Sequence, residues 1–203
     1  MFSINTPKIN VTFPATDGKP KVASVRFPTD DEWILRSRRR KVITRNLGRG
    51  RTQSDTIGAE EVDLEIYAAI RLEGSCDLDG AECMQLLDRV GSCEVLDYEH
   101  EGNGVAVSLL LPGDTEATHR LRVPTAKEVL DYKRGLAKVT TLSNGRDQIA
   151  IDITAAGRLW DALRLDHTGY DGPVPIVHKV HAIRAAVEAS ENMVFDEGPS
   201  ANF

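Results

Sequence analysis

The amino-acid sequence predicts an α+β fold made of two tandem, similar modules, each a β-hairpin followed by about three helices. Three observations support this prediction. Segments recur in the same order about one hundred residues apart, each series opens with two β-rich runs around a turn, and apolar residues at helical spacing follow. The predicted modules are residues 1–103 and 104–203. Because a module of this size buries little core by itself, we expect the two to pack against each other or against other subunits.

The recurrence is clearest where a strand is predicted to meet a helix. The stretch RFPTDDEW begins at Arg26, and RVPTAKEV begins 96 residues later at Arg122. Three further segments match in the same order: KVITRNLGR from Lys41 with KVTTLSNGR from Lys138, IYAAIRLEG from Ile66 with LWDALRLDH from Leu159, and, more weakly, the segments from Ala81 and Val180. Their separations are 97, 93 and 99 residues, and they change only in stretches rich in Gly, Ser, Asp and Pro. Duplicated modules diverge in this way, since insertions are tolerated in loops and not inside packed elements.

A hairpin is predicted at the start of each module. In the first module, a cluster of Pro, Asp and Gly separates two β-rich runs over residues 8–27, and in the second PGDTE occupies the same place. The motif P-T-x-x-E follows in both modules. Thr29 or Thr125 is expected to cap a helix, while Glu32 or Glu128 reaches back from the third helical position. The junction therefore predicts a helix directly after each hairpin.

The remaining helices are predicted from apolar periodicity. A second helix places apolar residues on one face in each module: Val62, Ile66, Ala69 and Ile70, matched by Ala155, Leu159, Ala162 and Leu163. A third helix is expected over residues 81–90 and 180–189. Between the first and second helices, a Gly-Arg pair predicts a turn in both modules, at Gly48-Arg49 and Gly145-Arg146.

Composition and charge restrict the function classes. The chain has 25 basic and 31 acidic residues, a net charge of −6, which argues against a general nucleic-acid binder. It has no run of 18 apolar residues and no signal-peptide pattern at its start, so we expect a soluble protein kept in a cytoplasm. The three cysteines, Cys76, Cys83 and Cys93, lack C-x-x-C spacing. We therefore expect neither a disulfide framework nor a zinc site, and no cofactor.

The densest chemical feature is a basic segment within RSRRRKVITRNLGRGR. It places eight cations in sixteen residues: Arg36, Arg38, Arg39, Arg40, Lys41, Arg45, Arg49 and Arg51. On a helix, Arg38, Lys41 and Arg45 would share a face. The segment would then bind an acidic protein surface or a phosphate backbone, or it would be a solvated face balanced by neighbouring acids such as those of the second helix. The second module keeps only four of these cations, so the fold does not require them.

Other motifs carry weaker signals. The stretch DLDG, from Asp77 to Gly80, resembles a calcium loop but has no Glu at the twelfth position, so helix capping is favoured. His178 and His181 could make half a metal site, but the sequence places no third ligand. No nucleophile has an assignable base, and the positions shared by the modules are mostly apolar, capping or turn residues. We therefore expect no enzyme, although a site between the modules is neither supported nor forbidden.

The hairpin and its helix junction resemble a family of small proteins encoded among the tail genes of tailed bacteriophages, which includes tail-assembly chaperones. The residues that carry the resemblance are VTFPATDGKPKVASVRFPTDDEW and, less fully, VSLLLPGDTEATHRLRVPTAKEV, about twenty per module. The resemblance implies a non-enzymatic structural or assembly protein that acts through protein contacts, with other phage proteins or copies of itself as partners. It would act in the host cytoplasm during assembly, or in the virion. The alternative is a nucleic-acid-binding module that uses the basic segment.

Overall fold

A computed structural model describes residues 8–14, 20–48 and 51–196 of the chain. The N-terminal half, up to residue 103, contains β1 (Ile9–Phe13), β2 (Lys21–Val25), α1 (Asp30–Arg39), β3 (Lys41–Gly48), β4 (Arg51–Ile57), α2 (Ala59–Ile70), α3 (Gly80–Gly91) and β5 (Glu94–Glu101). The C-terminal half contains β6 (Gly104–Leu111), β7 (Thr115–Arg122), α4 (Ala126–Leu136), β8 (Ala137–Thr141), β9 (Asp147–Ile151), α5 (Thr154–Leu163), β10 (Arg164–Thr168) and α6 (Ile176–Asp196). Across these described ranges there are six helices and ten strands in three sheets, so the predicted α+β class is confirmed.

The order of elements differs from the prediction at two places in each half, one of which is an additional strand, β5 after α3 in the first half and β10 between α5 and α6 in the second. Between the first and second helices lies a second hairpin, β3–β4 in one half and β8–β9 in the other. The segments KVIT and KVTT are rich in β-branched residues, which pack well on a pleated sheet and are less favoured in helices. The predicted helical face of Arg38, Lys41 and Arg45 is therefore wrong, because α1 ends at Arg39 and the other two residues lie on β3.

The predicted opening hairpins are present. Strands β1 and β2 pair antiparallel, and β6 and β7 pair through a turn in which Gly113 and Asp114 have positive φ. The loop of the first hairpin, residues 15–19, lies outside the described residues. Gly145, at φ +72°, lies in the turn between β8 and β9, as the Gly-Arg pair predicts, whereas Arg49 lies outside the described residues.

The second helices bury the faces that periodicity predicts. Val62, Ile66 and Ile70 on α2 are almost fully buried, as are Leu159 and Leu163 on α5. The two alanines included in those faces, Ala69 and Ala162, are exposed in both halves. A single cluster of buried side chains contains residues from both halves, and α6 packs on strands β5 and β6. The two halves thus share one core.

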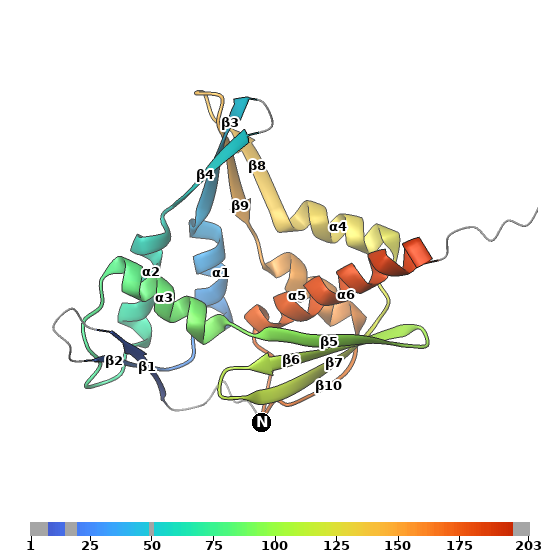
Figure 1. Cartoon of the computed structure of the whole chain (residues 1–203), viewed down its shortest axis with the longest axis horizontal. Helices are drawn as coiled ribbons and strands as arrows, with labels where there is room; N and C mark the ends of the chain where they lie inside the picture. Colours follow the sequence, from blue (N-terminus) through green and yellow to red (C-terminus); the bar gives the residue numbers. More distant parts are fainter. Residues whose placement is uncertain (1–7, 15–19, 49–50, 197–203) are drawn as a thin grey trace, which may run out of the picture.

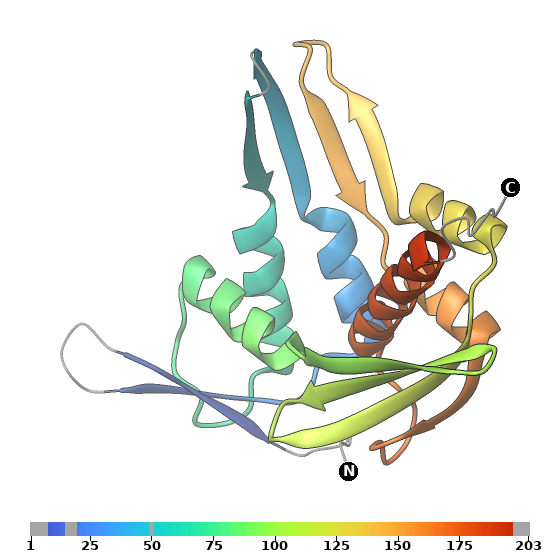
Figure 2. The ribbon, with the colours of Figure 1, turned by 45° about the vertical axis from the view of Figure 1, so that its right-hand side comes forward.

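The strands form three sheets, of orders β1-β2, β10-β7-β6-β5 and β4-β3-β9-β8. The last of these projects away from the helices as two arms, with β4 and β8 on its outer sides (Figures 1 and 2). The arms pair with each other from Lys41 opposite Ala150 to Thr44 opposite Asp147, which is the first half of β3 and nearly the whole of β9. Toward their tips the two hairpins diverge (Figure 2).

Candidate functional site

The junction between hairpin and helix forms the same hydrogen-bond network in both halves. Thr29 caps α1 by accepting from the Glu32 amide, and Glu32 accepts from the Thr29 amide at 2.7 Å. Arg26 donates to both oxygens of Glu32, at 2.7 and 2.8 Å. The motif thus fixes the angle between strand and helix through three side chains that lie within seven residues of sequence.

The C-terminal half repeats each of these contacts. Thr125 caps α4, and Glu128 accepts from the Thr125 amide at 2.9 Å and from both terminal nitrogens of Arg122. The hydrogen bond from Arg122 lowers the pKa of Glu128 to about 2, with the Thr125 amide adding to the effect. The predicted capping boxes are confirmed in both halves.

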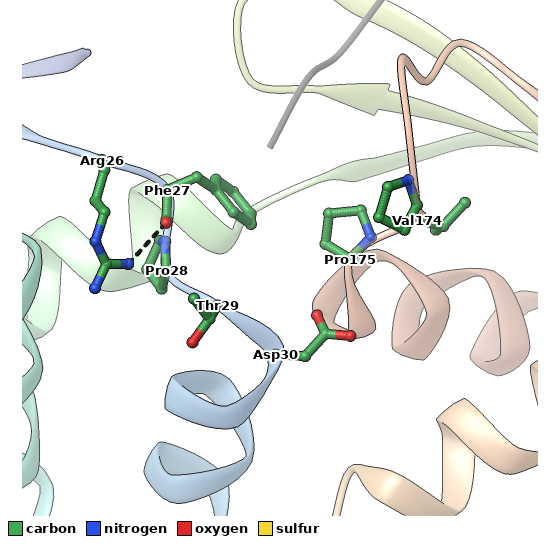
Figure 3. Close-up of a pocket in the computed structure, with 8 residues that line it drawn as sticks. Arg26, Phe27, Pro28, Thr29, Asp30, Val174 and Pro175 are labelled. Carbon is green, nitrogen blue, oxygen red and sulfur yellow. Dashed lines mark hydrogen bonds between the residues drawn. The ribbon is translucent and has the colours of Figure 1, made fainter. Parts of the chain in front are cut away.

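The first junction also contacts the C-terminal half. Asp30 accepts a hydrogen bond of 2.8 Å from the amide of Ile176, the first residue of α6. Figure 3 shows this carboxylate pointing toward Pro175, across a pocket of about 290 Å³ lined by the junction and residues 173–175. Asp30 therefore satisfies an amide at the start of α6, a role that sequence spacing cannot reveal because the two residues are 146 positions apart.

The basic segment begins with a buried ion network. Arg36 donates to Asp63 on α2 at 2.8 and 2.9 Å and to Asp88 on α3 at 2.6 Å. The Asp63 side chain is fully buried. Burial acts to lower the pKa of Arg36, but its hydrogen bonds to Asp63 and Asp88 outweigh burial and raise it. This guanidinium joins three helices and is directed into the protein.

The next three cations are also paired within the chain. Arg39 pairs with Glu65, and Arg40 approaches Asp88 at 3.4 Å. Arg38 reaches Asp152 in the other half at 3.2 Å. Lys41 and Arg45 lie on β3 at alternate positions and so on one face of the sheet. Arg49 and the side chain of Arg51 lie outside the described residues.

The eight cations therefore do not form one continuous ridge in the part of the chain that the structure describes. Four of them neutralise acids of α2, α3 and the second half, as the alternative of a balanced face predicted. The side chains of Arg38 and Arg39 are still about half exposed, and Arg45 is exposed. These exposed groups remain accessible to an acidic partner.

A cleft of about 490 Å³ lies between the two halves. Trp33 and Leu87 line it from the N-terminal half, and Ile151 and Val177 line it from the C-terminal half. Its titratable lining residues are Arg36, Arg40, Asp88 and His181. Two hydroxyls in the cleft donate to backbone carbonyls, Ser37 to Ile34 and Ser92 to Arg89. A hydroxyl that donates in this way is not paired with a base, so neither serine is activated as a nucleophile.

A cluster of buried rings fills the C-terminal half. Trp160 donates from Nε1 to Nδ1 of His119 at 3.1 Å, so neutral His119 carries its proton on Nε2, which lies 3.0 Å from the Tyr170 hydroxyl. Burial lowers the pKa of His119 and of His178 to about 3. Sequence patterns missed this cluster, because its members come from β7, α5, α6 and a loop.

The motifs considered for metals have structural explanations. Asp79 caps α3 by accepting from the Glu82 amide, so capping is confirmed for DLDG. His178 is buried against the rings of Phe27 and Tyr170. Within the described ranges, no group of three or more His, Cys, Asp or Glu side chains could hold a metal ion, and no helix is long and apolar enough to cross a membrane.

The outer edges of the four-stranded sheet form the largest feature that sequence analysis missed. Over the described residues, β4 pairs only with β3, and β8 only with β9. The side chains from Thr52 to Ile57 are exposed, as are those from Lys138 to Thr141. An unpaired strand edge presents free amide and carbonyl groups to a partner. The run of β-branched residues Val139, Thr140 and Thr141 is the sequence signal that could have found β8, whereas β4 carries no such run.

Comparison with protein families, with curated proteins and with solved structures finds no match to this chain.

Proposed function

We propose that this chain is a non-enzymatic structural or assembly protein of a tailed bacteriophage that acts through protein contacts. In this proposal it consists of two tandem modules, residues 1–103 and 104–203. One observation carries the protein-contact function: a sheet shared by both halves projects from the body with both outer edges open (Figure 2). Open edges of this length are used to add strands from a partner, and other proteins cover or shorten them.

The two-module arrangement is supported by element order and by register. Hairpin, helix, hairpin and helix occur in that order in each half, and a last helix follows, directly in the N-terminal half and after β10 in the C-terminal half. Lys41 lies opposite Ile57 in one arm, and Lys138 lies opposite Ala150 in the other, as the sequence matches at separations of 97 and 93 predict. The separation changes between these two pairs because the stretch from Lys41 to Ile57 is four residues longer than the stretch from Lys138 to Ala150.

The assignment to phage proteins depends on the resemblance of the hairpin-helix junction. Its motif residues are the ones that make the paired capping networks at Thr29 and Thr125. The test is cosedimentation with purified virions, together with binding of the purified chain to the capsid and tail proteins encoded beside its gene. A virion component sediments with particles, whereas a chaperone binds tail proteins and is absent from particles. A chain that binds neither would contradict the proposal.

Exposed cations of the basic segment supply the charged part of this contact in our proposal. Replacing Arg38, Arg39 and Arg40 by Ser is expected to weaken binding to the partner identified above by about tenfold or more while the thermal unfolding midpoint changes little, because exposed ion pairs contribute little to stability. The matched control replaces three exposed cations of the other half, Lys127, Arg158 and Arg184. Equal binding by both triple variants would remove the basic segment from the contact.

A further inference from the structure

The two arms of the sheet are joined head to tail. Strands β3 and β8 are the first strands of their arms and carry the matching stretches KVIT and KVTT, while β4 and β9 are the second strands. Pairing about a two-fold axis would join corresponding strands of the two arms, β3 with β8 or β4 with β9. The structure instead joins β3 to β9, a first strand to a second strand. This is a heterologous contact.

Pairing of β3 with β9 leaves β4 and β8 as the outer strands of the described sheet. The open edges are β4, a second strand, and β8, a first strand. These are the two kinds of edge that already pair inside the molecule. A heterologous contact that leaves complementary edges at both ends can be repeated by another copy, and it then generates a ring or an open filament.

Each of the two edges carries one exposed apolar side chain. Val139 on β8 is 58% exposed and Ile57 on β4 is 42% exposed. Within the sheet, Val42 and Val139 flank Ile149 in one row of side chains, which ends at Val139 on one side and at Thr56 on the other. A further copy would continue this row by placing its Thr56 beside Val139.

The charges of the two edges are complementary. Lys138 and Arg134 are exposed on the β8 side, and Asp55 and Glu60 are exposed on the β4 side. Inside the molecule, the head-to-tail contact is accompanied by the ion pair of Arg38 with Asp152. Arg134 is the sequence counterpart of Arg38, and Glu60 directly follows the counterpart of Asp152, so a repeated contact would bring these opposite charges close together.

A groove lies beside the β8 edge. Its volume is about 510 Å³, and Arg134, Lys138 and Val139 line it. A strand added to β8 would bring Ile57 and the start of α2 of the incoming copy to this groove. The edge therefore offers a cavity for the apolar end of β4 as well as backbone groups for its ladder.

We propose that the partner of the open edges is a second copy of this chain, whose β4 pairs antiparallel with β8 in the register of the internal contact. Lys138 then lies opposite Ile57 of the second copy, Val139 opposite Thr56, Thr140 opposite Asp55 and Thr141 opposite Ser54. This inference rests on the proposed function, because it names the partner of the same open sheet. Repetition of the contact produces rings or filaments of one chain.

The test uses two variants of the full chain, Val139→Lys and Ile57→Lys, and sedimentation velocity. The wild-type chain is expected to form assemblies larger than a dimer. Each variant alone is expected to be monomeric, with a dissociation constant raised about tenfold or more, because every contact would then include one altered edge. A mixture of the two retains one unaltered β8 and one unaltered β4, so it is expected to form dimers in a 1:1 ratio and nothing larger. The control Leu130→Lys changes a side chain on α4 that is 47% exposed and should assemble as the wild type does.

Disulfide trapping checks the register. Thr140→Cys and Asp55→Cys are expected to give a disulfide-linked dimer when mixed and none when either variant is oxidised alone. Cross-linking of either cysteine variant with itself would show that like edges pair, and it would overturn the inference. A wild-type chain that stays monomeric would overturn it too. So would a mixture of Val139→Lys and Ile57→Lys that forms no dimer. A chain that binds virion or tail proteins but not itself would overturn the inference and leave the proposed function standing, whereas binding to neither would contradict both.

Discussion

The N-terminal half has a charged triad, of which Arg36 and Asp63 are buried and Asp88 is exposed, at positions where the C-terminal half buries apolar side chains. Arg36, Asp63 and Asp88 join α1, α2 and α3 through an ion network. At the matching separations of 96, 93 and 99 residues, the C-terminal half has Tyr132, Ala156 and Val187, all of them buried in the shared core. The same arrangement of three helices therefore forms around either set. The first two positions are buried in both halves, so the ion pair of Arg36 with Asp63 occupies the place that Tyr132 and Ala156 occupy in the C-terminal half.

The largest expected effect breaks this charged triad. Replacing Asp63 by Ala leaves the Arg36 guanidinium buried without its main partner, so the free energy of unfolding should fall by about 3–5 kcal/mol. Urea denaturation monitored by circular dichroism measures it. A loss below about 1 kcal/mol would show that water replaces the carboxylate and that the network contributes little.

A triple replacement sharpens the same comparison. The changes Arg36→Tyr, Asp63→Ala and Asp88→Val copy the C-terminal triad into the N-terminal half. Stability should then return to within about 2 kcal/mol of the wild-type chain, because no buried charge remains without a partner. If the triple variant were no more stable than Asp63→Ala alone, the two sites would not be equivalent.

The halves also differ in their response to acid. His119 and His178 are buried in the C-terminal half with pKa values lowered to about 3, so the folded protein holds them neutral. In the unfolded chain the two histidines take up protons below about pH 6.5, whereas in the folded protein they do not. The free energy of unfolding is therefore at its full value above that pH and decreases as the pH falls toward 3. From pH 7.5 to pH 5, each histidine should lower the free energy of unfolding by about 2 kcal/mol. Urea titrations at three pH values test this, and replacing His119 by Phe should reduce the dependence by about half.

The capping networks should respond alike in both halves. Thr29→Ala and Thr125→Ala each remove the side chain that accepts from the third helical amide, so each should lower stability by about 1 kcal/mol. Thermal denaturation of the two variants side by side provides the measurement. A loss of stability in only one of the two variants would show that the two junctions make the same contacts but contribute unequally to stability.

The smallest expected effect concerns a contact present in one half only. Asp30, the first residue of α1, accepts from the first amide of α6, whereas Ala126 occupies the matching first position of α4. Asp30→Ala should therefore cost about 0.5–1 kcal/mol. Asp31→Ala is the control, because that side chain is exposed on the same turn. Equal costs for the two would assign the effect to the helix dipole of α1 and not to the bond with Ile176.

The sequence by itself determined the α+β class, the opening hairpins, the capped junctions and the buried faces of α2 and α5. These features depend on residues close together in the chain, such as Thr29 with Glu32 or Ile66 with Ile70, so local pattern is sufficient to find them. The second hairpins were missed, since a short segment of charged and β-branched residues between two helices carries no clear period. Arg36 was read as part of an exposed ridge, because nothing near it in sequence shows that Asp63 and Asp88 enclose it.

Only the tertiary structure decided how the two halves meet. Pairing of β3 with β9, the bond from Ile176 to Asp30 and the ring cluster around His119 each join residues far apart in the chain. Such contacts form where packing of the whole molecule brings surfaces together, and neither spacing nor composition encodes which strand of one arm faces which strand of the other. That choice leaves β4 and β8 as the two outer strands of the described sheet.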